Sequence, residues 1–174
     1  MKDGSPLVTI LMGSDSDLPV MAETARVLGK LQVSYELHVT SAHRSPERTA
    51  RIVGEAVAKG VRVFVVGAGS AAHLAGVVAA HTTRPVLGVP LAASDLKGLD
   101  ALLATVQMPA GIAVGTLAIG KAGAANAGWL AASILALADE QLASRLHAER
   151  EAMAGQVAAN SERAQSRLAE LLAD

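Results

Sequence analysis

The chain has 174 residues, a length that fits a single domain with one hydrophobic core. Its 15 basic and 16 acidic residues give a net charge of -1, so no basic field exists to attract polyanions. Only 2% of the residues are aromatic, which leaves no stacking platforms for single strands, and nucleic acid is not an expected partner. The absence of cysteine excludes disulfides, thiolate nucleophiles and cysteine-based metal sites.

The sequence favours neither membrane insertion nor export. Residues 1–6 are polar and lack the apolar region of a signal peptide. One weakly polar stretch, Ala122–Ala138, carries no charge, is rich in Gly and Ala and is shorter than a membrane span. We expect a buried helix there, at a contact between subunits, and a cytoplasmic protein with no membrane partner.

Apolar runs rich in Val and Ile alternate with segments of helical period, which is the pattern of βαβ units and a parallel sheet. The expected strands are, in chain order, Leu7–Met12, Ser34–Val39, Val63–Val66, Pro85–Val89 and Ile112–Val114. The expected helices are Pro19–Leu31, Pro46–Lys59, Ala72–Ala80, Gly98–Thr105 and Ala122–Leu137, followed by a helical segment from Glu140 to Ala173. Pro46 suits the first turn of its helix, behind a Ser45 cap.

This order of elements predicts a three-layer α/β/α fold with a flavodoxin-like parallel sheet of five strands in the order 2-1-3-4-5. Because no linker or repeat divides the sequence, we expect one domain over residues 1–174. Its core would span about residues 7–138 and its C-terminal helical extension about residues 139–174. Ligands of such sheets bind at the carboxyl ends of the strands, so the loops after strands 1, 2 and 3 should meet at one crevice.

A run of Gly, Ser and Asp, Gly13–Asp17, follows the first expected strand and opens a helix. Free N–H groups and the helix dipole make such a place a seat for an anion, to which Ser14 and Ser16 can donate hydrogen bonds. Gly13 lets the backbone come close, and Asp17 suits the hydroxyls of a ribose. Since Ser14 and Asp17 also have the spacing of a capping box, plain helix capping is the alternative interpretation.

The segment Ser41–Arg44 follows the second expected strand and places an imidazole beside a guanidinium. A histidine such as His43 can exchange a proton near neutral pH, which is typically worth about 10²–10⁴-fold in rate. Arg44 suits bidentate recognition of a phosphate. A solvated loop pair is the alternative, but the position at the carboxyl end of a strand favours a functional role.

The segment Gly67–Ala72 has the form G-x-G-x-x-A of a dinucleotide fingerprint. It follows the third expected strand rather than the first, and no acid stands about 20 residues further on to bind a ribose. We therefore expect that Gly67 and Gly69 let the backbone approach a small ligand. His73 either lines the same pocket or packs at the start of a helix.

The remaining segments point mostly to structural roles. The segment Gly115–Ala122 is one residue short of a P-loop, because Ala122 stands where Ser or Thr must hold magnesium. The entry into the following helix, Gly120–Asn126, predicts close packing against neighbours. Gln107–Gly111 is either a plain connection or a lid over the crevice. The three remaining histidines have no partners at metal-ligand spacing, namely His38, His81 and His147.

Taken together, these segments resemble the PurE family of purine biosynthesis. The three loops already described match family motifs in the same order and spacing, and the resemblance covers about residues 8–137. Two further stretches also look like family signatures, Val106–Pro109 and Ala118–Ala127.

The resemblance implies a mutase without cofactor or metal that converts N5-carboxyaminoimidazole ribonucleotide into 4-carboxy-5-aminoimidazole ribonucleotide. The carbamate would lose carbon dioxide in a closed pocket and the ring carbon would capture it, with His43 as the proton shuttle. Ser14 and Arg44 would hold the phosphate with help from Ser16, and Asp17 would bind the ribose. The other expected substrate-binding residues are Gly13, Ser41, Gly69, Ser70 and His73.

The family also implies a homo-octamer with sites at subunit contacts. Its second class, which carboxylates aminoimidazole ribonucleotide with free carbon dioxide, is one alternative, and a non-catalytic nucleotide-binding module is another. Two residues depart from the family pattern, Ser70 in place of Gly and Ala75 in place of Pro. To keep carbon dioxide in and water out, we expect Met108 to line the pocket and the 107–111 loop to cover it.

Overall fold

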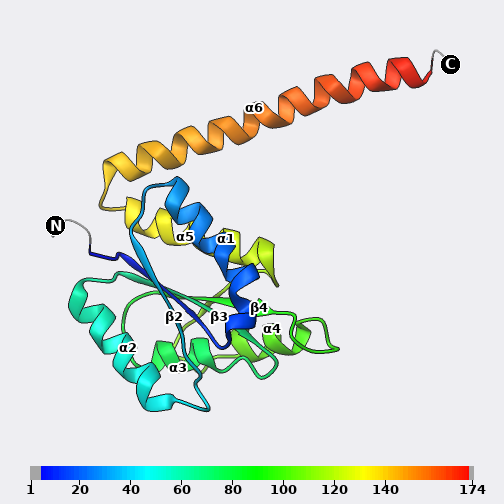
Figure 1. Cartoon of the computed structure of the whole chain (residues 1–174). Helices are drawn as coiled ribbons and strands as arrows, with labels where there is room; N and C mark the ends of the chain where they lie inside the picture. Colours follow the sequence, from blue (N-terminus) through cyan, green and yellow to red (C-terminus); the bar gives the residue numbers. More distant parts are fainter. Residues whose placement is uncertain (1–4, 173–174) are drawn as a thin grey trace. The chain divides into compact units, whose positions relative to one another are not determined.

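The computed structural model describes residues 5–172, which comprise a parallel sheet flanked by helices and a long C-terminal helix (Figure 1). Contacts divide the chain into two units, residues 1–135 and residues 136–174. The single domain expected over the whole chain stays a prediction. In the described part of the chain, no helix is both long and apolar enough to cross a bilayer.

The sheet has five parallel strands in the order β2-β1-β3-β4-β5, which confirms the predicted topology. Register is continuous across the centre, where Val8 of β1 lies between Tyr35 of β2 and Val63 of β3. The strands are β1 (Val8–Met12), β2 (Tyr35–Val39), β3 (Val63–Gly69), β4 (Val86–Leu91) and β5 (Gly115–Thr116).

Helices cover both faces of the sheet, α1 and α5 on one face and α2, α3 and α4 on the other (Figure 1). A short 3-10 helix, η1 (Asp15–Asp17), leads directly into α1. The α-helices are α1 (Leu18–Lys30), α2 (Pro46–Lys59), α3 (Leu74–Ala80), α4 (Leu99–Val106), α5 (Lys121–Ala136) and α6 (Glu140–Leu171).

The core forms because the central strands are almost continuously apolar. Every residue of β1 and β4 is buried, as expected for strands covered on both faces. Helix α2 buries Thr49, Ile52, Val53 and Ala56, which recur at the 3.6-residue period of one helix face. It ends at Gly60, whose φ of 103° supplies the left-handed cap that glycine adopts most readily.

Small residues let α1 and α5 approach the other face closely. A side chain at Gly67 of β3 would collide with Met21 of α1, and one at Gly128 of α5 would meet Val27 at 2.9 Å. The buried hydroxyl of Thr24 donates a 2.7 Å hydrogen bond to the carbonyl of Ala124. This confirms the predicted close packing of the helix that follows Gly120.

Three sequence-based expectations need correction. The expected strand Ile112–Val114 lies off the sheet, because a turn with Gly111 at φ 95° precedes it, and β5 begins at Gly115. Helix α3 begins at Leu74 rather than Ala72, because Ala72 has a φ of 44° that no α-helix contains.

The third correction concerns the start of α2. Pro46 occupies the first turn as expected, but the Ser45 hydroxyl donates to the Ser41 carbonyl (3.1 Å) and does not cap the helix.

Helix α6 belongs to the second unit. Its N-cap is Asp139, whose carboxylate accepts a 2.9 Å hydrogen bond from the backbone N–H of Leu142. Such a cap satisfies one of the free N–H groups in the first turn and sets where the helix begins. From there the helix continues for 32 residues.

Candidate active site

The loops that follow β1, β2 and β3 line one cavity of about 320 Å³ at the carboxyl edge of the sheet. All ten site residues expected from the sequence lie on its wall. The first loop contributes Gly13, Ser14, Ser16 and Asp17, the second Ser41, His43 and Arg44, and the third Gly69, Ser70 and His73. The sheet topology brings them together because parallel strands end at the same edge.

The first loop is held by a capping box. The Ser14 backbone N–H donates to the Asp17 carboxylate (3.0 Å), and the Ser16 N–H donates to the Ser14 hydroxyl (3.3 Å). The Ser16 hydroxyl also donates to the Ser14 hydroxyl at 2.9 Å. The capping interpretation is therefore confirmed, and the same residues also face the cavity.

Burial raises the pKa of the Asp17 carboxyl above its ordinary value, and the negative charge of Asp15 adds to the increase. Hydrogen bonds from the backbone N–H groups of Ser14 and Gly13 lower it in part. The folded chain thus holds this proton to a higher pH than the unfolded chain does. The free energy of unfolding must therefore fall as pH rises from the unfolded-state pKa of Asp17 through its folded-state pKa. Ionised Asp17 thus destabilises the folded chain.

The second loop is a tight turn closed by its own serines. The Ser41 hydroxyl accepts from the Arg44 backbone N–H (3.1 Å), and the Ser41 carbonyl accepts from the Ser45 N–H (2.9 Å). The Ser45 hydroxyl accepts from the Ser41 N–H at 3.2 Å. With its backbone groups engaged in this way, the turn leaves the side chains of His43 and Arg44 exposed.

The third loop brings His73 against His43. The distance from His43 Nε2 to His73 Nδ1 is 2.8 Å, and the ring planes meet edge to face at 83°. His73 is the residue before α3 but makes no side-chain cap, so its ring belongs to the cavity rather than to the helix start. A hydrogen bond at this distance requires a proton on one nitrogen and a lone pair on the other.

The backbone of this loop is strained at two residues. Ser70 has a φ of 54° and Ala72 a φ of 44°, in the left-handed region that glycine adopts most readily. A glycine at position 70, which the resemblance to the PurE family implies, would adopt this conformation without strain. Strain of this kind persists only where surrounding structure enforces it, and here it shapes the cavity wall.

The glycines of the third loop have packing roles as well. A Cβ at Gly69 would collide with that of Ala93, which follows β4 and also lines the cavity. Ala93 was missed from the sequence because an alanine after a strand carries no chemical signal.

Neither Met108 nor the 107–111 loop lines this cavity, which corrects the expectation of a lid built from them. The Met108 sulfur lies by Gly76 of α3, 3.1 Å from where a Cβ would stand.

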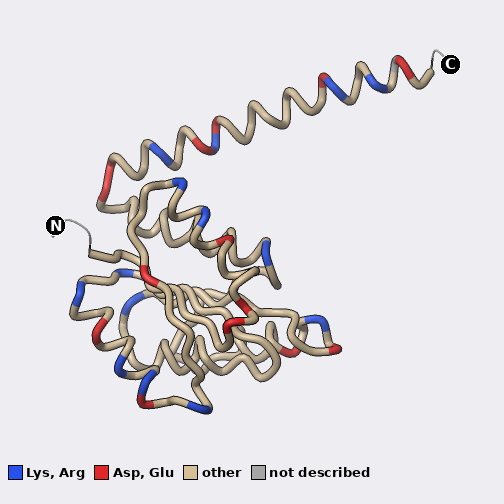
Figure 2. The backbone as a smooth tube through the Cα atoms, in the orientation of Figure 1, with Lys and Arg blue, Asp and Glu red and all other residues tan. Residues whose placement is uncertain are grey.

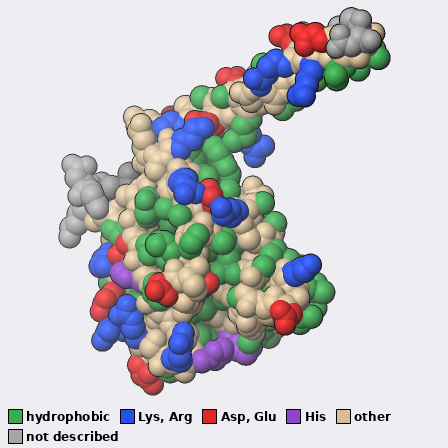
Figure 3. All heavy atoms as spheres, turned by 45° about the vertical axis from the view of Figure 1, so that its right-hand side comes forward, with side chains coloured by type: hydrophobic (Ala, Val, Ile, Leu, Met, Phe, Trp, Pro, Cys, Tyr) green, Lys and Arg blue, Asp and Glu red, His purple; other side chains and the backbone are tan. Residues whose placement is uncertain are grey.

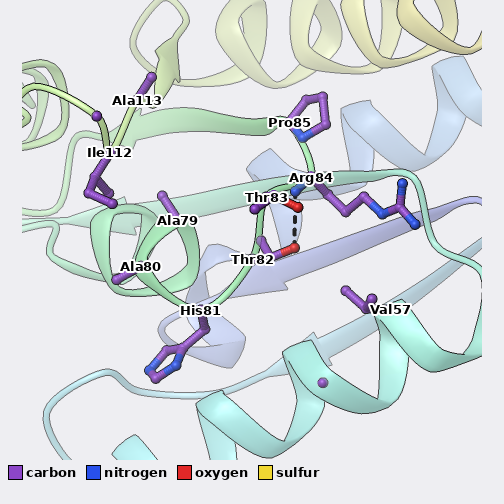
Figure 4. Close-up of a pocket in the computed structure, with 12 residues that line it drawn as sticks. Val57, Ala79, Ala80, His81, Thr82, Thr83, Arg84, Pro85, Ile112 and Ala113 are labelled. Atoms are coloured by element: carbon purple, nitrogen blue, oxygen red, sulfur yellow. Dashed lines mark hydrogen bonds between the residues drawn. The ribbon is translucent and has the colours of Figure 1, made fainter.

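A second cavity of about 1000 Å³ opens at the other edge of the sheet, where β4 begins (Figure 4). It lies between α2, α3 and residues 111–113, and apolar side chains such as Val57 and Ile112 line much of it. Its two basic side chains, His81 and Arg84, point away from one another. In the first cavity, by contrast, the rings of His43 and His73 are in contact.

Comparison with known proteins gives one consistent result. Residues 7–156 match the model of the AIR carboxylase family. The chain is 53% identical over 153 residues to an N5-carboxyaminoimidazole ribonucleotide mutase of Vibrio parahaemolyticus, covering 88% of this chain and 95% of that protein. It is 51% identical over 146 residues to the Bacillus subtilis mutase, covering 84% and 90%. The crystal structure of Treponema denticola PurE superposes with a TM-score of 0.83 at 26% identity, covering 91% of this chain and 98% of that one.

Proposed function

Since the chain belongs to the AIR carboxylase family, we propose that it converts N5-carboxyaminoimidazole ribonucleotide into 4-carboxy-5-aminoimidazole ribonucleotide in de novo purine biosynthesis. The enzyme is thus an isomerase that moves a carboxylate from nitrogen to carbon within one ribonucleotide. We assign the active site to the smaller cavity because His43 and His73 form a hydrogen-bonded pair on its wall.

The reaction requires the enzyme to donate one proton to the substrate and to accept one proton from it. Breaking the N–C bond of the carbamate releases carbon dioxide and leaves an amine nitrogen that must gain a proton. The ring carbon then attacks carbon dioxide to form the new C–C bond and must lose its own proton. A single group that donates first and accepts later balances both steps, and His43 is the proposed group.

The contact with His73 suits such a group. The pair shares one proton across the 2.8 Å contact, which leaves Nδ1 of His43 and Nε2 of His73 as its two outer nitrogens. When a proton binds at one outer nitrogen, the proton between the two rings can therefore move from one ring to the other. His73 would in this way hold the His43 ring in place and fix which of its nitrogens carries the proton.

The cavity also contains groups that suit a sugar phosphate. Arg44 supplies a guanidinium for the phosphate, and the hydroxyls of Ser14 and Ser16, which lie 2.9 Å apart, line the same cavity. Asp17 would accept from ribose hydroxyls, and such donors would favour the ionised carboxyl that burial otherwise disfavours. Gly13, Ser41, Gly69 and Ser70 would form the remaining wall against the substrate.

A labelling experiment tests the reaction. The carbamate substrate carries ¹³C in its carboxylate, and the assay contains excess unlabelled bicarbonate. A mutase that recaptures its own carbon dioxide retains the label in the product, beyond the slow background measured without enzyme. Loss of the label to the bicarbonate pool, or a requirement for bicarbonate, would instead identify the direct carboxylase.

The homo-octamer and the cytoplasmic location stay predictions. Exposed leucines on and before α4, Leu96, Leu99 and Leu103, are compatible with contacts between subunits. Light scattering of the purified chain measures the number of copies directly.

A further inference from the structure

The buried polar side chains that the structure describes are all threonines, namely Thr9, Thr24, Thr40, Thr49 and Thr105. Because a hydroxyl buried without a partner costs free energy, each of them is expected to form a hydrogen bond. Thr24 and Thr105 each donate to a backbone carbonyl at 2.7 Å, and the hydroxyl of Thr9 donates to a carboxylate at 3.1 Å. Thr40 and Thr49 differ from these, because their hydroxyls bond to one another at 2.8 Å.

This threonine pair joins the two ends of the turn that contains His43. Thr40 directly follows β2, and Thr49 lies in the first turn of α2. The Thr49 hydroxyl also donates to the Ser45 carbonyl at 3.2 Å, and that carbonyl accepts from the Thr49 backbone N–H at 3.1 Å. Since a hydroxyl has one proton, Thr49 donates to Ser45 and accepts from Thr40. One buried side chain of α2 therefore contacts the residue before the turn and the last residue of the turn.

The outer side of the turn faces solvent. The side chains of His43 and Arg44 are exposed, and Figure 3 shows histidine side chains on the molecular surface. Figure 2 shows charged residues of both signs along α2. One of them, Arg48, donates to the carbonyl of Val39 at 3.3 Å, but this contact is exposed and competes with water. The surface charges thus do little to fix the turn, so contacts on its buried side must set its position.

We propose that Thr49 is a positioning residue for the reaction, and that it acts through the turn containing His43 and Arg44. Its hydroxyl fixes Thr40 relative to Ser45, and the turn between them presents an imidazole and a guanidinium to the cavity. This inference rests on the proposed function, in which those two groups act on the substrate. The rate is sensitive to such placement, because a displacement of about 1 Å can cost about 10²-fold.

A role in stability alone is the alternative interpretation, and it predicts a different result. Two hydrogen-bonded threonines can be replaced by two valines of the same shape with little change in stability, because neither hydroxyl is then left unpaired. If Thr40 and Thr49 served stability alone, Thr40→Val/Thr49→Val would also keep its turnover. If the pair positions the turn, this double variant recovers stability but not turnover.

Turnover and urea denaturation of the full chain test the proposal. Thr49→Val leaves the Thr40 hydroxyl without its close partner, so kcat should fall about tenfold, less than a displacement of 1 Å can cost. Thr49→Ser keeps the hydroxyl and should retain kcat. Thr105→Val is the matched control, because Thr105 is also buried in a helix and donates to the carbonyl four residues earlier. It should lower the urea midpoint as Thr49→Val does, but keep kcat.

Hydrogen exchange tests the turn without reference to the reaction. The backbone N–H groups of Ser41, Arg44 and Ser45 are all hydrogen-bonded inside the turn, so their exchange reports whether it stays closed. We expect these amides to exchange about tenfold faster in Thr49→Val, which corresponds to about 1.4 kcal/mol. In Thr49→Ser and Thr105→Val they should exchange as in the unsubstituted chain.

The outcomes separate this proposal from the proposed function. Unchanged exchange of the turn in Thr49→Val would overturn the positioning role, and so would turnover that returns together with stability in the double valine variant. If the unsubstituted chain did not isomerise the carbamate, the proposed function would be wrong. Faster exchange of the turn in Thr49→Val would then still support the contact through which Thr49 holds it.

Discussion

Of the two cavities at the edges of the sheet, the smaller one is lined by more groups that can take part in chemistry. The cavity at the carboxyl edge has about a third of the volume of the other, 320 Å³ against 1000 Å³, yet it gathers two imidazoles, a guanidinium, a carboxylate and several hydroxyls. The larger cavity also has a histidine and an arginine, but they point to different sides (Figure 4). Chemistry therefore follows convergence of polar groups, and volume alone does not indicate it.

The sheet explains this difference. Each carboxyl end of a central strand leads into a loop that starts a helix, so N–H groups and side chains of neighbouring loops face the same space. The other edge receives the ends of helices α2 and α3, and the cavity there is a gap between them. Matched substitutions in the two cavities can break or sharpen this comparison.

The largest effect is expected from His43→Asn. Asparagine can hydrogen-bond but cannot exchange a proton at neutral pH, so kcat should fall by about 10²–10⁴-fold while the ribonucleotide still binds. His81→Asn in the larger cavity is the matched control and should leave kcat unchanged. Steady-state turnover and calorimetric binding distinguish the two parameters, and near-normal turnover of His43→Asn would refute the proton-shuttle role.

A smaller and different effect is expected from Arg44→Ala. Removing a charge-assisted contact to phosphate should raise KM roughly 10- to 100-fold, from about 1.5–3 kcal/mol of lost binding, with less change in kcat. Arg84→Ala, in the larger cavity, should change neither value. An unchanged KM for Arg44→Ala would show that the phosphate lies elsewhere.

The role of His73 as a positioning residue predicts a pair of results. His73→Phe keeps a ring in place but removes the acceptor or donor opposite His43 Nε2, so kcat should fall by about 2- to 10-fold, the value of one hydrogen bond. His73→Asn places an amide near the same point and should recover most of that loss. If the two variants are equally impaired, His73 acts through something other than this hydrogen bond.

Much of this arrangement was predictable from sequence because it depends on local patterns. Continuous Val and Ile runs identified the buried strands, and the order of elements gave the strand order. The three loops could be placed in one crevice because topology alone decides where the ends of parallel strands meet. The ten expected residues share a cavity for that reason.

Features that depend on tertiary geometry could not be predicted. The contact of His43 with His73 joins residues 30 positions apart, and nothing in either loop indicates it. Met108 was expected to line the crevice because the reaction must keep carbon dioxide in and water out, but its sulfur lies by Gly76 of α3. The left-handed Ser70 was also not apparent, because serine gives no hint of a positive φ.

Ser70 supplies the smallest predicted effect, one on stability. With a φ of 54°, Ser70→Gly should relieve about 1–2 kcal/mol of steric strain, reduced by the greater freedom that glycine has in the unfolded chain. We expect a net gain of about 0.5–1 kcal/mol in the free energy of unfolding, measured by urea denaturation. Ala71→Gly is the matched control, since Ala71 is not among the positive-φ residues, and it should lose about 0.4–1 kcal/mol. Opposite signs at these neighbouring positions would show that the strain is confined to Ser70 and is not shared by Ala71, whereas a loss at both would mean that the serine hydroxyl outweighs the strain.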